Sequence, residues 1–286
     1  MALGAKTSIE PSLDRYRDAL LTSSRLSAIP KLRHGITGRI PGAAPAEANI
    51  GYGTPRDKDA AWTERQRWSN AAGIDPLAVS TVHQVHGRGV VRVDISDRGR
   101  GGPLGSGSLG QADALITNSP GVAVMTLHAD CLPIILVDPD ALAVCAIHSG
   151  WRGTVADVPG AAIAAMVEQL GAAPGRIVAM IGPGIRSCCY EVGDEVISGW
   201  REVAGDDAGI AIAAGTRRWH LDLPAANRWL LLRAGIKPEH VDDLALCTRC
   251  HGDRWFSHRG QGPETGRFAA MVGIAPTTTE ESNSWL

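Results

Sequence analysis

The fold is decided by the stretch LAVCAIHSGWRGT, which occupies residues 142–154. Its first six residues form an unbroken apolar run, a pattern typical of a strand that is buried on both faces. Gly150 and Gly153 then let the backbone turn tightly and pass close to a ligand. The residues that follow predict a helix that extends through Leu170. A strand, a tight turn and a helix therefore succeed one another, and His148 lies at the carboxyl end of the strand, where side chains face clefts.

Short apolar runs on both sides of this unit predict further strands. They are rich in Val, Ile and Leu, the composition of buried central strands. A Gly-rich loop or hairpin is predicted after the first of them, at 98–110. The predicted strands lie near 83–93 and at 112–117, 122–127, 134–137 and 177–181.

Helical spacing and capping residues predict helices around these strands. A peripheral helix is expected at 12–22, a second helix at 59–72 and a third at 193–203. Asp222 caps a further helix, with Pro224 in its first turn.

The order of these elements predicts one domain. Strands and helices alternate, and neither a linker nor a repeat interrupts them. We therefore expect a single layered α/β sandwich with a mixed central sheet over residues 29–275. Residues 1–28 are expected to form an N-terminal extension with a peripheral helix, and 276–286 a polar tail with the composition of a disordered segment.

Composition limits the classes of function. The 286 residues are 44% hydrophobic, which can supply a sizeable core, and 20% charged with a formal net charge of -2. This near neutrality argues against nucleic-acid or membrane binding by electrostatic attraction. The first residues lack a basic segment followed by an apolar run, and no stretch approaches the ~20 apolar residues of a membrane span. We expect a cytoplasmic protein, a monomer or small homo-oligomer, that acts on a small neutral or anionic substrate.

Three residues are candidate metal ligands because each stands at a break in regular structure. His148 follows the buried strand, Cys131 lies in the kink HADCLP between two apolar strands, and His86 has glycine beside it in QVHG. Two imidazoles and one thiolate suit zinc. Each residue alone has an ordinary interpretation as a core or loop residue, and the wide spacing lacks the paired signature of structural zinc motifs.

Strings of sequence across nearly the whole chain resemble one known family. They are NIGYG (49–53), QVHG (84–87), DALIT (113–117), ADCLP (129–133), HSGWRGT (148–154), IGPGIRSCCYEVG (181–193), DLPAANR (222–228), LCTRC (246–250) and FSHRG (256–260). In these strings the chain is similar to the YfiH family, which is also called the laccase-domain or polyphenol oxidase family. Its members are described more recently as purine nucleoside phosphorylases. One departure is His128, which stands where many relatives carry threonine.

The resemblance implies an α/β sandwich that binds zinc through His86, Cys131 and His148. It also implies phosphorolysis of adenosine, inosine and guanosine, cleavage of methylthioadenosine, and hydrolytic deamination of adenosine. Purine nucleosides and inorganic phosphate are then the partners.

Two alternatives to this function stay open. One is copper-dependent oxidation of phenols, although nine scattered histidines are few for a multicopper cluster. The other is a cysteine hydrolase that edits peptidoglycan precursors, with Cys131 as the nucleophile and His148 as its base.

The implied chemistry needs a proton carrier and a site for phosphate. Asp130, next to the thiolate ligand, is the nearest candidate carboxylate in the sequence, and a supporting hydrogen bond to a ligand or to backbone is an equal alternative. Arginines suit an anion such as phosphate. The candidates are Arg152 as a catalytic residue, and Asn49, Arg65, Arg186 and Arg259 as substrate-binding residues, with Arg267 also considered.

The remaining histidine and cysteine motifs have structural interpretations. His128 lies close to the candidate thiolate, but we expect a loop histidine with satisfied hydrogen bonds. The six cysteines are expected to be thiols, because a chain of this length needs no disulfide framework. Cys188 and Cys189 are adjacent, and Cys247 and Cys250 form a lone CxxC motif without a second pair, so core or loop thiols are expected there and a second metal site has no support.

Overall fold

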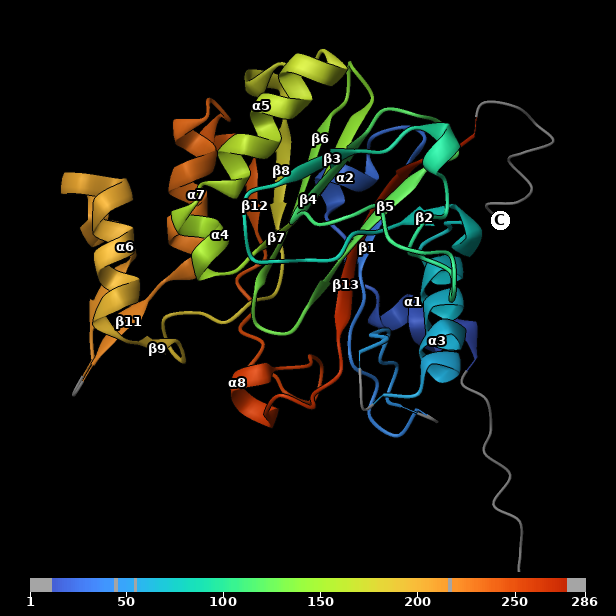
Figure 1. Cartoon of the computed structure of the whole chain (residues 1–286), viewed down its shortest axis with the longest axis horizontal. Helices are drawn as coiled ribbons and strands as arrows, with labels where there is room; N and C mark the ends of the chain where they lie inside the picture. The colour runs from blue at the N-terminus through green and yellow to red at the C-terminus, as the bar shows by residue number, and fades with distance from the viewer. Residues whose placement is uncertain (1–11, 44–45, 54–55, 216–217, 277–286) are drawn as a thin grey trace, which may run out of the picture.

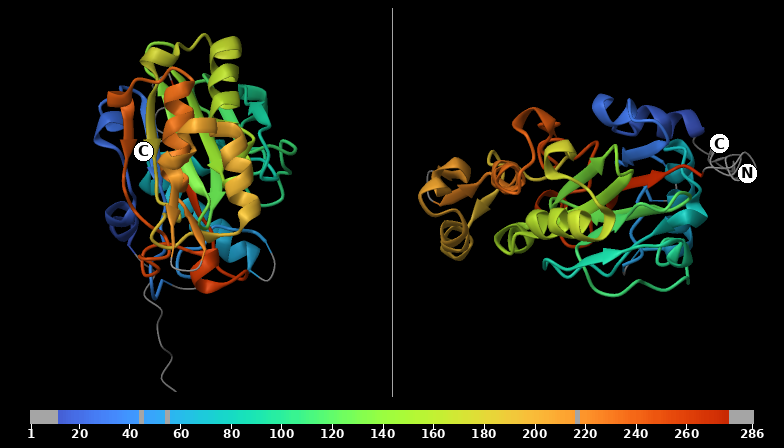
Figure 2. Two further views of the ribbon diagram at one scale, coloured as in Figure 1. Left: turned by 90° about the vertical axis from the view of Figure 1, so that its left-hand side faces the viewer. Right: turned by 90° about the horizontal axis from the view of Figure 1, so that it is seen from above.

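Two β-sheets that pack face to face form the centre of the molecule (Figure 1). The computed structural model describes residues 12–43, 46–53, 56–215 and 218–276. Helices cover the outer face of each sheet, so the layers are helix, sheet, sheet and helix (Figure 2). This arrangement confirms the expected layered α/β sandwich with a mixed sheet.

The larger sheet has six strands in the order β12-β8-β6-β7-β4-β3. β6 runs antiparallel to β7 and β8, whereas β12 is parallel to β8 and β3 is parallel to β4, so the sheet is mixed. In that order the strands span Val241–Asp243, Val178–Ile181, Leu132–Asp138, Ala143–Ser149, Ala114–Thr117 and Val90–Arg92.

The smaller central sheet has four strands in the order β1-β13-β5-β2. β13 pairs antiparallel with both β1 and β5, and β2 is parallel to β5. In that order the strands span Leu32–Ile36, Phe268–Ile274, Ala123–His128 and Val79–Ser80. A separate three-stranded sheet consists of β10 (Ile212–Ala214), β11 (Trp219–Leu221) and β9 (Glu191–Val192).

Strands of the larger sheet are buried on both faces. In β6, Leu132, Ile134 and Leu136 pack in the core under the helices, whereas Ile135 and Val137 face the smaller sheet. A strand in this position is a continuous apolar run and does not alternate. The predicted strands at 112–117, 134–137 and 177–181 of this sheet are confirmed, and so is the strand at 122–127, which is β5 of the smaller sheet.

The helices lie in two groups. α4, α5, α6 and α7 contribute to the core on the outer face of the larger sheet, and α1 and α3 cover the smaller sheet. The α-helices α1 to α8 span Leu13–Ala19, Ser24–Ser27, Lys58–Ala71, Trp151–Val155, Val158–Leu170, Asp194–Ala204, Leu223–Arg233 and His258–Gln261. Short 3-10 helices η1 to η5 span Pro76–Ala78, Ile95–Asp97, Pro174–Arg176, Gly205–Ala211 and Pro238–His240.

Most predicted helices are confirmed. α3 and α6 fall on the helices expected at 59–72 and 193–203. The side chain of Asp222 accepts a hydrogen bond from the backbone N–H of Ala225 at 2.9 Å, which is the expected N-cap of α7.

The helix expected to run through Leu170 is instead two helices, α4 and α5. Asp157 separates them with a left-handed backbone (φ 59°), and its carboxylate accepts a hydrogen bond from the N–H of Gly160 as the N-cap of α5. Pro159 stands in the first turn of α5, where it cannot donate a backbone hydrogen bond to the preceding turn. A continuous helix is therefore excluded.

The strand expected near 83–93 is mostly a loop. Regular pairing is confined to β3, at Val90–Arg92, together with an isolated bridge between His83 and Gln111. His86 has a left-handed backbone (φ 61°), which no strand accommodates. The loop is held by the functional site described below.

The N-terminal extension packs against the smaller sheet through α1, as the expected peripheral helix. Tyr16 is fully buried, and its ring meets the indole of Trp68 edge to face with centroids 4.9 Å apart. The Tyr16 hydroxyl donates to Glu64 at 2.5 Å.

Residues 1–11 of the extension and 277–286 of the expected polar tail lie outside the described residues. Within the described part of the chain, no helix has the length and apolar character needed to cross a membrane.

His34 on β1 gives the fold a predicted sensitivity to acid. The ring is buried, and its Nε2 accepts a hydrogen bond from the N–H of Ser23 at 3.0 Å. Burial lowers the pKa of His34 to about 4. Between that pKa and the ordinary value of about 6.5, the unfolded chain binds more protons than the folded one. The contribution of His34 is therefore complete above about pH 6.5 and is lost as the pH falls towards 4.

Replacement of the ring, His34→Gln, is expected to make the free energy of unfolding less dependent on pH. Urea unfolding at pH 7, 6 and 5 measures this free energy, and the loss between pH 7 and pH 5 should be smaller in the variant by about 2 kcal/mol. His258→Gln is the matched control, because that ring is exposed to solvent in the folded protein. Equal pH dependence in wild type and His34→Gln would contradict the assignment.

Candidate metal centre

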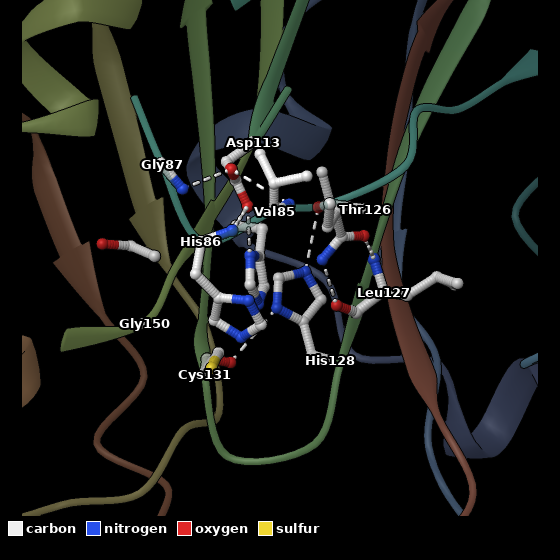
Figure 3. Close-up of polar contacts among 12 residues, drawn as sticks. Val85, His86, Gly87, Asp113, Thr126, Leu127, His128, Cys131 and Gly150 are labelled. Atoms are coloured by element: carbon white, nitrogen blue, oxygen red, sulfur yellow. Dashed lines mark hydrogen bonds and ion pairs between the residues drawn. The ribbon is translucent and has the colours of Figure 1, made fainter. Parts of the chain in front are cut away.

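His86, Cys131 and His148 meet at one point of the molecule (Figure 3). Their ligand atoms all lie within 4.8 Å of one another, and the two imidazole rings are 4.9 Å apart between centroids. His86 comes from the loop between β2 and β3, Cys131 from the turn between β5 and β6, and His148 from the end of β7. Pairing of Pro133 with His148 brings the turn beside that strand end. The structure thus brings together the three predicted ligands.

Asp113 organises two of these residues from beneath. Its fully buried carboxylate accepts a hydrogen bond from Nδ1 of His148 at 2.8 Å. It also accepts from the backbone N–H groups of Val85, His86 and Gly87 at 3.3, 3.0 and 2.6 Å. Because Nδ1 of His148 is engaged, Nε2 is the nitrogen left for a metal. The same carboxylate therefore orients one ligand and holds the loop that carries the other.

Gly150 leaves room for the centre. A Cβ atom at this position would lie 2.9 Å from Sγ of Cys131 and 3.3 Å from Cδ2 of His86, so a side chain would intrude among the ligands. This confirms the expectation that glycine in the turn after β7 allows a close approach of the backbone.

The charges of the site favour a thiolate. Burial alone would raise the pKa of Cys131, but the charge and hydrogen bonds of His148 and His86 outweigh it and lower the pKa to about 6. Burial would lower the pKa of His148, and the Cys131 thiolate and Asp113 instead raise it. Thiolate is the form in which cysteine binds metals.

This donor set fits one metal ion with a coordination position to spare. Two imidazoles and a thiolate match a catalytic zinc site with three protein ligands, and imidazole and thiolate also suit copper. His148 and Cys131 are largely enclosed, whereas His86 is exposed, so the centre opens to solvent on one side. The space beside Gly150 supports the same fit.

His128 supports the centre and does not join it. Its Nδ1 donates to the carbonyl of Cys131 at 3.1 Å, and its Nε2 lies 2.9 Å from Oγ1 of Thr126, which then donates to it. Both nitrogens are engaged, as expected of a loop histidine with satisfied hydrogen bonds. The ring lies 5.4 Å from that of His148.

A cavity of about 520 Å³ opens in front of the three ligands. This volume is typical of sites for small molecules. Besides the ligands, its wall includes Asp130, Tyr190 and three arginines, Arg56, Arg259 and Arg267.

Asp130 and Arg259 are the predicted residues that reach this cavity in addition to the ligands. Asp130 has a left-handed backbone (φ 86°), and its carboxylate accepts hydrogen bonds from the hydroxyl of Thr248 and the backbone N–H of Arg259, both at 2.6 Å. The guanidinium of Arg259 donates to the carbonyl of Glu191 at 2.8 Å. Arg267, also considered from the sequence, lines the cavity too.

Asn49 acts on the backbone of the cavity wall. Its side-chain oxygen accepts hydrogen bonds from the N–H groups of Gly51 and Arg267 at 3.0 and 2.7 Å. Both of those residues line the cavity, whereas Asn49 is not among the described residues that do. Its contacts are those of a loop support.

Three predicted arginines lie outside the described lining of the cavity. Arg65 is buried, stacks on Tyr52 and donates to three backbone carbonyls. Arg186 forms a two-pronged ion pair with Asp243, with both contacts at 2.9 Å. Arg152 is exposed, with its guanidinium 4.4 Å from the ring centroid of Trp151. Local partners therefore engage the guanidinium groups of Arg65 and Arg186, whereas the charge of Arg152 acts on Tyr190 in the cavity wall and opposes the rise in its pKa that burial causes.

Sequence reasoning missed Asp113 and Arg56. Asp113 is the first residue of the string DALIT. An acidic residue directly before a buried strand is the signal in the sequence that could have marked it as a site residue. The sequence around Arg56 contains no comparable signal, because Arg56 reaches the cavity wall only when loops that are distant in the sequence fold together.

The fold and site define a mixed α/β protein with a candidate metal centre that opens into a cavity of ligand size. The chain belongs to the family described as multi-copper polyphenol oxidoreductase laccase, whose model matches residues 33–275.

Characterised relatives and solved structures agree with this assignment. The chain is 36% identical to purine nucleoside phosphorylase ORF3 of Streptomyces griseus over 262 residues, which is 91% of this chain and 98% of the relative. It is 35% identical to adenosine deaminase RL5 of an unknown prokaryotic organism over 196 residues, 68% of this chain and 74% of the relative. The crystal structure of the Bacillus licheniformis hypothetical protein YfiH superposes with a TM-score of 0.81 at 28% identity, covering 86% of this chain and 94% of that one. The resemblance to the YfiH family is confirmed.

Asp113→Asn is expected to weaken metal binding by about 10- to 100-fold, because the amide no longer fixes the tautomer and orientation of His148. Competition with a chromogenic chelator measures the affinity for Zn²⁺. Asp138→Asn is the matched control, since Asp138 is also fully buried and hydrogen-bonded but lies at the opposite end of β6. Equal affinities of the two variants, each folded by circular dichroism, would refute the role of Asp113.

Proposed function

We propose that the protein is a zinc-dependent purine nucleoside phosphorylase that also deaminates adenosine. Its substrates under this proposal are adenosine, inosine, guanosine and methylthioadenosine, together with inorganic phosphate. The observation that carries the proposal is the open centre of His86, Cys131 and His148 in the wall of a cavity that also presents arginine donors. The names of the relatives support the same chemistry.

The two imidazoles and one thiolate of this centre suit a single zinc ion better than a cluster of several copper ions. When bound, it would supply a Lewis acid and lower the pKa of bound water to about 7. A multicopper centre draws on many imidazoles. Among the described residues, one group of potential ligands contains histidine, and it offers two imidazoles, those of His86 and His148. These are too few for a multicopper centre.

The arginines of the cavity wall are proposed to hold phosphate. Nε of Arg56 is buried without a hydrogen-bond partner among the described residues, so an anion would satisfy a donor that otherwise costs stability. Burial and the charge of Arg56 lower the pKa of Arg267, and both arginines line the cavity. Phosphate between them would relieve this repulsion. Arg259 adds a third positive charge at the same wall.

Asp130 is proposed as the group that carries the proton in deamination. Its oxygens already accept from Thr248 and Arg259, and each retains a second lone pair that can accept a hydrogen bond from substrate. These two bonds hold the carboxylate at the cavity, next to the Cys131 ligand.

A cysteine hydrolase is the second candidate, and one observation favours it. Cys131, His148 and Asp113 are arranged as nucleophile, base and orienting acid, the order of a catalytic triad. A second imidazole, His86, also faces the thiolate, which a nucleophile does not need and a metal does. The convergence of all three therefore favours metal binding.

Removal of one ligand, His86→Ala, is expected to lower kcat/KM for phosphorolysis of inosine by about 100-fold or more. Release of hypoxanthine with phosphate present measures the activity, and elemental analysis measures the metal. His251→Ala is the control, since His251 is exposed and lies outside the described lining of the cavity, and its activity should stay close to that of wild type. Unchanged turnover in His86→Ala would sink the proposal. Activity that resists chelators but is lost to iodoacetamide would favour the cysteine hydrolase. Stoichiometric copper together with turnover of phenols would favour a copper-dependent polyphenol oxidase.

Arg267→Met is expected to raise KM for phosphate by roughly 10- to 100-fold, the loss of a charged hydrogen bond. Ammonia release from adenosine needs no phosphate and should fall less. Initial rates at varied phosphate measure the first effect. Arg92→Gln is the control, because Arg92 bonds to Asp94 and the carbonyl of Gln169 away from the cavity. An unchanged KM for phosphate in Arg267→Met would contradict the anion site.

A further inference from the structure

Four cysteine side chains form a second cluster outside the His–Cys–His centre. Cys188, Cys189, Cys247 and Cys250 place all their sulfur atoms within 4.8 Å of one another. Sγ of Cys250 lies 3.6 Å from that of Cys188 and 3.4 Å from that of Cys189. The CxxC motif has no second pair nearby in the sequence, and the fold supplies one from the adjacent cysteines. The four thiols were expected in the core or in loops, and the structure brings these loop thiols together at one point.

The topology of the larger sheet explains why these cysteines meet. Cys188 and Cys189 follow β8, and Cys247 and Cys250 follow β12. The two strands are parallel neighbours, so their carboxyl ends and the loops that leave them lie side by side. An isolated bridge between Gly184 and Cys247 continues the pairing beyond the strands.

The spacing of the sulfur atoms fits one metal ion. All six cysteines are free thiols, and a disulfide would need a sulfur–sulfur distance of about 2.05 Å. Four thiolates at about 2.3 Å from a tetrahedral zinc ion lie about 3.8 Å from one another. The two sulfur–sulfur contacts of Cys250, at 3.4 and 3.6 Å, are close to that edge length.

We propose that these four cysteines bind one zinc ion as a closed structural site. Four protein sulfurs complete a tetrahedron, so the site keeps no position for substrate, in contrast to the His–Cys–His centre. Soft thiolates select zinc over hard cations such as magnesium or calcium.

The surroundings of the cluster suit bound thiolates. Burial raises the pKa of Cys247, but the backbone N–H groups of Cys250 and Arg186 and the neighbouring thiols outweigh it and lower the pKa, whereas burial raises the pKa values of Cys188 and Cys189. The guanidinium of Arg249, inside the CxxC motif, donates to the carbonyl of Cys189 at 3.4 Å. Arg249 therefore provides one positive charge beside the loop of Cys188 and Cys189.

The zinc would cross-link two loops that build one wall of the cavity. The loop after β8 contributes Ile185 and Tyr190 to that wall, and the loop after β12 leads to Arg259. Thr248, between the two cysteines of the CxxC motif, donates to the carboxylate of Asp130. We therefore assign the four-cysteine site a positioning role. This assignment does not depend on which reaction the cavity supports.

Metal analysis in a Cys131→Ser background tests the proposal. That variant lacks a ligand of the other centre, so zinc measured by elemental analysis of the purified full chain reports on the cluster. One zinc per chain is expected in Cys131→Ser, and less than 0.2 per chain, roughly a fivefold loss, in Cys131→Ser/Cys250→Ser. Cys131→Ser/Cys145→Ala is the matched control, since Cys145 is buried in the core away from the cluster, and it should retain the zinc.

A second measurement covers the case in which loss of Cys250 prevents folding. In Cys131→Ser, native mass spectrometry should show zinc, and the four cluster thiols should resist a thiol reagent until a chelator is added. Absence of metal, iron in place of zinc, or the loss of two hydrogens that marks a disulfide would each overturn the proposal. Because none of these readouts uses turnover, failure here is distinguishable from failure of the proposed phosphorylase activity.

Discussion

The buried carboxylate of Asp113 is the interaction on which the candidate active site depends. A carboxylate removed from water is costly unless donors surround it, and here four donors do: Nδ1 of His148 and the N–H groups of Val85, His86 and Gly87. These bonds hold residues 85–87 outside the strand pairing that begins only at Val90, and His86 has a left-handed backbone. One charge therefore converts a segment with strand-like composition into a ligand loop.

The site lies where the chain crosses between the two central sheets. His86 is on the connection from β2 in the smaller sheet to β3 in the larger, and Cys131 is on the connection from β5 to β6. The long return from β12 to β13 carries Arg259 and Arg267. Crossing segments leave the hydrogen-bonding pattern of either sheet, so their side chains and backbone groups are available for a ligand. His148 alone belongs to a regular strand, and its register against β6 fixes the others around it.

Features that depend on a local pattern of residues could be predicted from the sequence, whereas features that depend on contacts between distant segments could not. Strands buried on both faces are continuous apolar runs, so the centre of the larger sheet could be predicted, whereas the pairing of Leu32 with Ile274 in the smaller sheet has no local signal. The break between α4 and α5 did have one, in Pro159. The residues alone marked His86, Cys131 and His148 only as candidate metal ligands, because ligands so far apart carry no local signature, and the resemblance to the family singled them out. Arginines could not be sorted, because a guanidinium serves backbone carbonyls, as in Arg65, as well as it serves an anion, as Arg259 is placed to do.

The two sulfur-containing centres differ in their ligands, and this difference suits one of them to catalysis and the other to a structural role. The His–Cys–His centre depends on imidazoles that a carboxylate orients, and exposure of His86 keeps one side accessible. The four-cysteine cluster sits at the ends of two parallel strands and has no imidazole among its four potential ligands. A closed thiolate site cannot compete for substrate, so it can stiffen the loops beside the cavity without intruding on the reaction. Cys131 is then the cysteine in the wall of the cavity, and the histidines next to it lower its pKa against the effect of burial.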